Sequence, residues 1–312
     1  MSEEKKNQNS EVTRRRFVGA AATVGAAATM LPVESCAQVA GSDAVTPRGL
    51  RLFFEEDLWQ DQERVHTAEQ VAYLVFGERS EPHLQTGTVD NVNTTTWTTV
   101  TLDHTYNSMV VVASASYAAG DPPLATRVRN AQGNTFQIQV QHAGGSSVPV
   151  SGVTVHYTVV EEGVYTEAQH GVNMEAVRFT STVTDSSKSW VGQRRDYSNT
   201  YVRPVVVGQV MSANDADVSI FWARGASAAD PPSASQLFVG KHVGEDTPSK
   251  RDHEVIGYLV IESGSGSVGN MGYVAKVGVE SVVGPDNGAP VTYLLSGLDS
   301  TLAAVVTRLR HP

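Results

Sequence analysis

Cysteine is almost absent from this chain: Cys36 is the only one among 312 residues. A single cysteine excludes an intrachain disulfide and a metal site built from several thiolates. The fold must therefore be stabilised by burial of apolar side chains. A hydrophobic content of 40% with 18% charged residues is typical of a soluble globular protein.

Positive charge is also scarce, with 23 Lys and Arg against 33 Asp and Glu and a formal net charge of −10. Binding a polyanion requires clustered Lys and Arg that neutralise phosphates, and the basic residues here are scattered. We therefore expect no nucleic-acid partner. The acidity is typical of a solubilising surface.

The sequence lacks the motifs of the common catalytic and cofactor sites. No Gly-x-Ser-x-Gly elbow occurs, and the nine histidines never form a pair with metal-ligand spacing. We therefore expect no cofactor, no metal and no enzymatic activity, and a hydrolase is the third-ranked interpretation.

An export signal is indicated at the N-terminus. Arg14 and Arg15 precede an alanine-rich apolar run over residues 17–33, which is too short for a stable membrane span. This layout is typical of a twin-arginine signal, here residues 1–37, and predicts a periplasmic, cell-surface or extracellular protein without a membrane span in the mature chain. Cleavage after Ala37 is one outcome. Lipidation of Cys36 in a lipoprotein is the other.

One strand signature occurs three times, over residues 69–75, 153–159 and 254–260. Each copy alternates apolar with other residues around a central Tyr and is followed by a Glu within a few residues. A pattern that recurs at the spacing of one small β domain indicates an array of repeats.

The segments around the signatures predict an all-β fold. Short alternating or continuous apolar runs with frequent turns favour antiparallel six-stranded sandwiches over residues 85–165 and 170–265. Residues 38–49 are small and polar and predict a linker. Residues 50–80 contain only the last strands of a repeat, and residues 266–312 only the first.

Two incomplete repeats at the ends of the chain would expose unpaired strand edges, which folded proteins generally avoid. The two segments could pair with each other and close a third sandwich. They could instead pair with neighbouring molecules, as in a filament, or be covered by surface contacts.

Residues 87–161 follow the order Gly-Thr-Val, Trp, Val-x-Leu, Val-Val-Val, Arg-Val-Arg-Asn, Phe-x-Ile-x-Val and Tyr-x-Val-x-Glu. This order resembles the H-type lectin domain, a six-stranded antiparallel sandwich, and the related repeat of large bacterial surface proteins. Residues 63–76 are similar to the end of those bacterial repeats. The resemblance extends over residues 50–265.

The resemblance implies sugar binding by a trimer, and we therefore expect a homo-oligomer. The family places an Arg on a central strand and a Trp-His pair beyond the strand before the last. The Arg position corresponds to Arg127 or Arg129. The Trp-His position corresponds to His142 in one repeat and to Trp59 and Gln60 in the N-terminal segment.

Trp59 is also a candidate from its neighbours, because an exposed ring between Asp57 and Asp61 offers an apolar face flanked by acceptors for hydroxyl groups. The alternative is a ring that packs over its own sandwich edge. Trp97 and Trp190 stand in alternating strands and are expected in the core.

These observations predict an exported, non-catalytic surface or periplasmic protein that binds carbohydrate or a matrix polymer. The alternative is a structural subunit that polymerises through its incomplete terminal repeats.

Overall fold

The computed structural model describes residues 35–40, 44–59, 62–186, 189, 191–228, 230–298 and 302–308. Arg14 and Arg15 of the export signal, Gln60, Trp190 and the side chain of Cys36 lie outside the described part. Strands dominate the described residues, which contain one short α-helix, α1 (Glu167–His170), and one 3-10 turn, η1 (Pro285–Asn287). The predicted all-β class with antiparallel sheets is confirmed.

Residues 84–161 form a first sandwich, in which a sheet of order β6-β10-β8 packs on the pair β7-β9. Its strands are β6 (Leu84–Val92), β7 (Thr98–Tyr106), β8 (Met109–Tyr117), β9 (Leu124–His142) and β10 (Val153–Glu161). Arg129 Nε donates to Gln137 Oε1 at 2.8 Å, although eight residues of straight strand would span about 26 Å. Strand β9 therefore folds back on itself, near Gly133 with its φ of +62°.

Residues 163–262 form a second sandwich with the same strand order. One sheet runs β11-β12-β17-β14 and the other β13-β16-β15. The strands are β11 (Gly163–Tyr165), β12 (Met174–Ser181), β13 (Gln193–Asp196), β14 (Pro204–Val210), β15 (Ile220–Arg224), β16 (Gln236–His242) and β17 (Glu254–Glu262). The signature strand, β17, is central in its sheet, as β10 is in the first sandwich.

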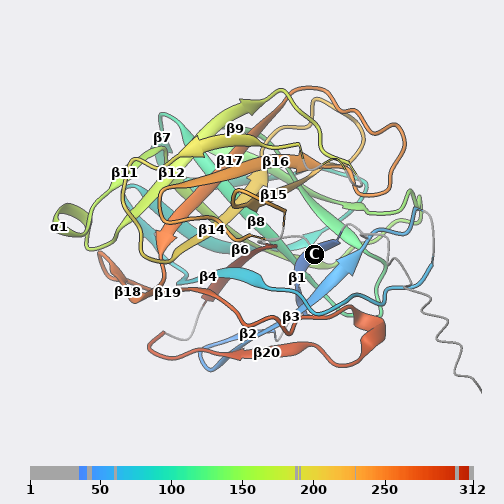
Figure 1. Ribbon diagram of the computed structural model, residues 1–312, viewed down its shortest axis with the longest axis horizontal. Helices are drawn as coiled ribbons and strands as arrows, with labels where there is room; N and C mark the ends of the chain where they lie inside the picture. The colour runs from blue at the N-terminus through green and yellow to red at the C-terminus, as the bar shows by residue number, and fades with distance from the viewer. Residues whose placement is uncertain are drawn as a thin grey trace, which may run out of the picture. The chain divides into compact units, whose positions relative to one another are not determined.

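The two ends of the chain together form a third, terminal sandwich. Its sheets are β18-β19-β4-β21 and β20-β3-β1, with β2 also paired to β3. The strands are β1 (Ser35–Ala40), β2 (Val45–Thr46), β3 (Gly49–Glu56), β4 (Val71–Gly77), β18 (Gly264–Val268), β19 (Met271–Val277), β20 (Val291–Leu294) and β21 (Leu302–Arg308). Figure 1 shows the blue N-terminal strands beside the red C-terminal ones. The incomplete repeats therefore pair within one chain.

The segment predicted as a linker, residues 38–49, differs from the expectation. Strand β1 starts at Ser35, crosses the predicted signal boundary at residue 37, and pairs antiparallel with β3. It also pairs in parallel with β8 through Val39 and Ala40. The polar composition suggested a loop, but β1 supplies the partner that one edge of β3 needs, while β20 supplies the other.

The signature tyrosines join the two sheets of each sandwich. Tyr157 meets Phe136 edge-on with 5.4 Å between ring centroids, and Tyr258 stacks on Phe221 at 6.4 Å. In the terminal sandwich Tyr73 stacks on Tyr293 at 5.2 Å. Each pair crosses the sandwich, and aromatic pairs of this geometry stabilise beyond their buried area.

The three sandwiches share a central contact. Strands β8, β14 and β21 pack against one another, and each contacts the signature strand of a neighbour: β8 meets β17, β14 meets β4 and β21 meets β10. The contacts run head to tail and close after three steps, as in a cyclic trimer. The repeat in the sequence thus becomes an approximate threefold arrangement within one chain.

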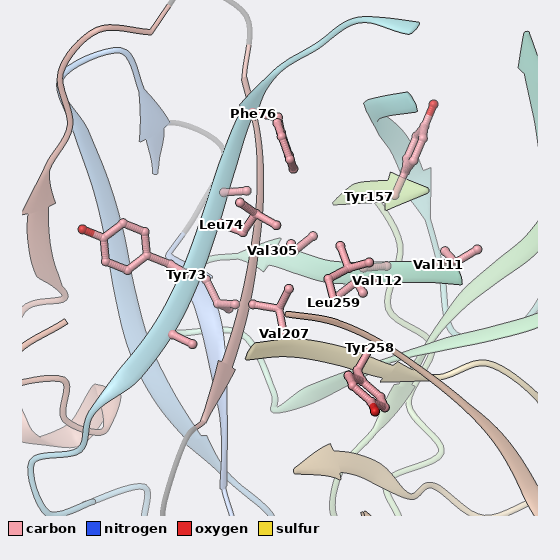
Figure 2. Packing of buried hydrophobic residues seen from close by; sticks show 14 of the residues in the cluster. Tyr73, Leu74, Phe76, Val111, Val112, Tyr157, Val207, Tyr258, Leu259 and Val305 are labelled. Carbon is pink, nitrogen blue, oxygen red and sulfur yellow. The ribbon is translucent and has the colours of Figure 1, made fainter. Parts of the chain in front are cut away.

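Figure 2 shows this centre, where aliphatic side chains from all three sandwiches meet and the three signature tyrosines point outward in different directions. The fully buried aliphatic residues labelled there are Leu74, Val111, Val112, Val207, Leu259 and Val305.

Backbone donors at this centre are bonded across sandwiches. Val306 N–H donates to Ser114 Oγ at 3.0 Å, and Gly208 N–H donates to Thr307 Oγ1 at 3.1 Å. Each hydroxyl satisfies a buried N–H on the edge of a neighbouring strand, which would otherwise carry the cost of an unpaired donor.

Candidate functional site

Trp59 lies in the loop that follows β3, and neighbouring sandwiches hold that loop on both sides. Its own N–H donates to Asp57 Oδ1 at 3.3 Å, and Glu245 N–H of the second sandwich donates to Asp57 Oδ2 at 3.0 Å. Leu58 N–H donates to the Ala143 carbonyl of the first sandwich at 3.1 Å. The short Asp side chain makes this turn because it reaches a backbone N–H two residues further on.

The indole ring covers a glycine. A Cβ on Gly145 would lie 2.6 Å from the Trp59 ring, and Gly145 has a φ of +69°. Only glycine accepts both the contact and that backbone conformation without strain. Trp59 thus packs across the junction onto the first sandwich rather than over its own edge, and 44% of it stays exposed.

A hollow of about 350 Å³ opens beside this ring, and we call it the Trp59 hollow. It draws residues from all three sandwiches: Trp59, Thr94, Thr95, Gln141, His142, Gly145, Ser146, Ser147, Asp217 and Val218. Apart from the ring, a valine and a glycine, these residues carry hydroxyl, amide, imidazole or carboxylate groups. Two of the residues predicted from the sequence, Trp59 and His142, are therefore brought together.

The polar side chains that line the Trp59 hollow include His142 and Asp217. His142 Nε2 lies 2.5 Å from the Val148 carbonyl, which can only accept, so Nε2 carries the proton in this pairing. Nδ1 then has no hydrogen-bond partner within the described ranges, but it is buried and does not face the hollow as an acceptor. Asp217 is exposed, and its carboxylate is an acceptor for hydroxyl donors.

Arg127 lies behind the residues that line the Trp59 hollow and holds the Gln141 side chain in place. Its guanidinium donates to Gln141 Oε1 at 2.6 Å and to the carbonyls of Asp215 and Ala216 at 2.8 and 3.0 Å. Burial lowers the pKa of Arg127, while Glu254 and Asp215 oppose that shift. Arg127 joins the Gln141 side of the hollow to the second sandwich and does not itself line the cavity.

Arg129 lies elsewhere on β9. Its guanidinium stacks over Trp97 at 4.1 Å from the ring centroid, and its Nε bonds to Gln137. Trp97 was expected in the core, but it stands just before β7 and is only half-buried beneath this cation. The contact with Arg129 explains how a partly exposed Trp occupies that position.

Gln141, Asp217 and the serines and threonines of the hollow carried no signal in the sequence. They stand at the end of β9 or in loops of different repeats, where polar residues are ordinary. Only the convergence of the three sandwiches gathers them.

Two buried pairs close the base of the loop that carries Trp59. Arg64 Nε donates to Glu55 Oε1 at 2.6 Å, and Arg64 Nη2 pairs with Glu55 Oε2. His66 Nδ1 lies 2.5 Å from Glu56 Oε1, and its Nε2 lies 3.4 Å from Glu69 Oε1. The described residues of the Trp59 loop, 57–59 and 62–63, thus lie between partners on β3 and partners just after the loop.

Glu55 is a strongly perturbed carboxyl of this region. Burial raises the pKa of Glu55 to about 7, although the hydrogen bond and charge of Arg64 and the Tyr117 hydroxyl act against that shift. Only 1% of the residue is exposed, so the loss of hydration outweighs the pairing. Glu55 also lines a second hollow of about 30 Å³ on which Trp59 borders, together with Asp57 and His242.

In the part of the chain with assigned positions, no cluster of three or more His, Cys, Asp or Glu could hold a metal ion. Within the same ranges no helix has the length and apolar character needed to cross a membrane. No family model, no curated protein and no solved structure matches this chain.

Proposed function

We propose that the Trp59 hollow binds carbohydrate, and that the chain is an exported, non-catalytic surface or periplasmic protein that holds a glycan or matrix polymer there. The observation that carries this proposal is the convergence of an exposed indole ring and polar groups from three sandwiches on one cavity.

The side chains that line the Trp59 hollow are of the kinds that bind a sugar. A pyranose has an apolar face that packs on an aromatic ring, and hydroxyl groups around its edge that need donors and acceptors. The hollow offers the Trp59 ring, four Ser and Thr residues, the Gln141 amide and the carboxylate of Asp217. Its volume of about 350 Å³ lies within the range of small-molecule sites.

The strand order supports the resemblance to H-type lectins. Each of the three sandwiches has the signature strand central in one of its sheets. Three sandwiches in one chain also supply the trimeric grouping that the resemblance implies. A homo-oligomer of this chain stays a prediction, as do twin-arginine export and lipidation of Cys36.

The filament alternative has less support. Strand β4 is paired on both edges, by β19 and β21, and β3 is paired by β1 and β20. Polymerisation through the terminal repeats would require these pairs to open first. Carbohydrate binding requires no such change.

A glycan array followed by calorimetry with the best glycan tests the proposal. Trp59→Ala should weaken binding by about tenfold or more, because loss of aromatic contact costs about 1.5 kcal/mol. Arg129→Ala is the matched control and should leave the affinity unchanged, since Arg129 lies outside the hollow. Silence across the array, or equal losses in the two variants, would count against the site.

A further inference from the structure

Asp217 carries the one carboxylate that lines the Trp59 hollow in the described part of the chain. Within the same ranges no Lys or Arg borders the cavity, and the other polar side chains there are hydroxyls, an amide and an imidazole. The cavity therefore presents a negative charge beside the Trp59 ring, without a guanidinium or an ammonium of the protein to neutralise it.

Neutral polar groups of the hollow already bond within the protein. Gln141 Nε2 donates to the Ala216 carbonyl at 3.2 Å, and Gln141 Oε1 accepts from Arg127 at 2.6 Å. Thr95 Oγ1 donates to Asn93 Oδ1 at 3.0 Å. An amide has two N–H groups and two lone pairs, and a hydroxyl has one O–H. These groups therefore keep only part of their hydrogen-bonding capacity for a ligand.

The Asp217 carboxylate keeps all of its capacity. The backbone N–H of Asp217 donates to Asp215 Oδ1 at 3.0 Å, which holds the turn before β15 without using the Asp217 side chain. That side chain is exposed and accepts no hydrogen bond from the described residues. Hydrogen bonds to an ionised group are roughly twice as strong as neutral ones. A ligand donor therefore binds most strongly at Asp217.

The buried cations of this region do not make it positive. Arg127 and Lys241 are 5% and 0% exposed. The carboxylates that act on them belong to four residues, Glu254, Asp215, Asp217 and Asp252. Arg251 also acts on both, but it is paired with Asp246. Carboxylates therefore outnumber the remaining cations, and the net charge favours a cationic ligand over an anionic one.

We propose that the Trp59 hollow selects a sugar with a free amino group, whose ring packs on Trp59 while its ammonium group binds the Asp217 carboxylate. This inference names the class of glycan and rests on the proposed function, since it assigns the ligand of the same cavity.

An amino sugar matches both chemical features of the cavity. Its ammonium group supplies three N–H donors and a positive charge to Asp217, and a cation near an indole face gains further attraction. Acetylation of the amine removes the charge and leaves an amide with one N–H. A uronic acid would place a second carboxylate near Asp217, and like charges brought together oppose binding.

Calorimetry on the full protein at about pH 7, where most of the sugar amine carries its proton, tests the selection. Three probes are compared: a glucosamine disaccharide, the same disaccharide with both amines acetylated, and a galacturonic acid disaccharide. The amine form should bind about fivefold or more tightly than the acetylated form, as expected for one partly exposed charge pair. The galacturonic acid form should bind most weakly, and added salt should reduce the preference for the amine.

Two variants assign the preference to one carboxylate. Asp217→Asn keeps the backbone N–H bond to Asp215 and should bind the amine and acetylated forms with equal affinity. Asp196→Asn makes the same change in charge on β13, where the side chain is 68% exposed and lies outside the hollow, and it should keep the wild-type preference. Equal affinities in the wild type, or a preference that survives Asp217→Asn, overturn the proposal.

Failure of the selection can be told apart from failure of the proposed function. If the acetylated form binds the wild type as tightly as the amine form, and Trp59→Ala weakens both, carbohydrate binding stands and the selection for an amine is wrong. If no glycan binds, the proposed function is wrong and the selection fails with it.

Discussion

Two of the glutamates that follow the signature strands hold the turns that precede β8 and β14. Glu161 accepts hydrogen bonds from Asn107 N–H at 2.9 Å and Ser108 N–H at 2.7 Å, directly ahead of β8. Glu262 does the same ahead of β14, with Val202 and Arg203 at 2.7 and 2.9 Å. In these two repeats the recurring Glu of the sequence pattern is therefore a structural residue.

We predict that Glu161→Ala lowers the free energy of unfolding by about 1–3 kcal/mol, because two backbone N–H groups lose a charged acceptor. Urea denaturation measures the effect. Asp196→Asn is the control: Asp196 pairs with Arg194 at 2.8 Å, but both side chains are more than 60% exposed, and such pairs contribute little. Equal unfolding midpoints for the two variants would refute this role.

Single residues were predictable where their own chemistry marked them. Trp59 and His142 reach the same hollow, as a ligand site requires, and Arg127 stands behind it. Arg129 does not reach the hollow, because it lies two residues beyond Arg127 on the strand and is therefore about 6.6 Å further from the end of β9. The sequence could not rank Arg127 above Arg129, since both belong to the same alternating pattern.

At the scale of the element, the strongly apolar strands were predictable and the weakly apolar ones were not. Strand β8 is buried along its whole length, and the three signature strands are central in their sheets. Strand β1 consists mostly of small residues and runs into a segment that resembles a loop, and its pairing with β3 and β8 makes it a strand. Strand propensity is weak in such segments, so the partner decides.

Strand β21 shows that a terminal element can be central to the fold. Val305→Asp should lower the free energy of unfolding by more than about 4 kcal/mol or abolish folding, because it places an unpaired carboxylate at the contact of the three sandwiches. Circular dichroism and urea denaturation measure this change.

Val279→Asp is the matched control, since Val279 is 70% exposed and the same substitution should be nearly neutral there. If both variants unfold at the same urea concentration, β21 does not form part of the core.

At the scale of the whole molecule, the strands of the third sandwich come from both ends of the chain and pair with each other. In the first sandwich β8 and β9 are joined by residues 118–123, whereas the equivalent strands of the terminal sandwich, β21 and β1, belong to opposite ends of the chain. All three sandwiches nevertheless have the same strand order. Pairing across the termini leaves neither incomplete repeat without its partner strands.

A circular permutant follows from this arrangement. Residues 264–308, joined to residues 35–262 by a linker as long as residues 118–123, should fold with an unfolding free energy within about 2 kcal/mol of the native order. Every strand pair is kept and only the connection changes. Urea denaturation and size-exclusion chromatography measure the outcome, and a permutant whose new ends lie inside the fully buried strand β8 is the control that should fail.

The sequence by itself determined the all-β class, the threefold recurrence and the incomplete repeats at the two ends, because these depend on local apolar periodicity. Only the tertiary structure decided which partner the terminal strands take, that residues 35–40 and 45–46 form strands, and that Trp59 meets residues of two other sandwiches. Those outcomes depend on contacts between residues far apart in the chain, where burial of shared apolar surface and satisfaction of strand edges outweigh local propensity.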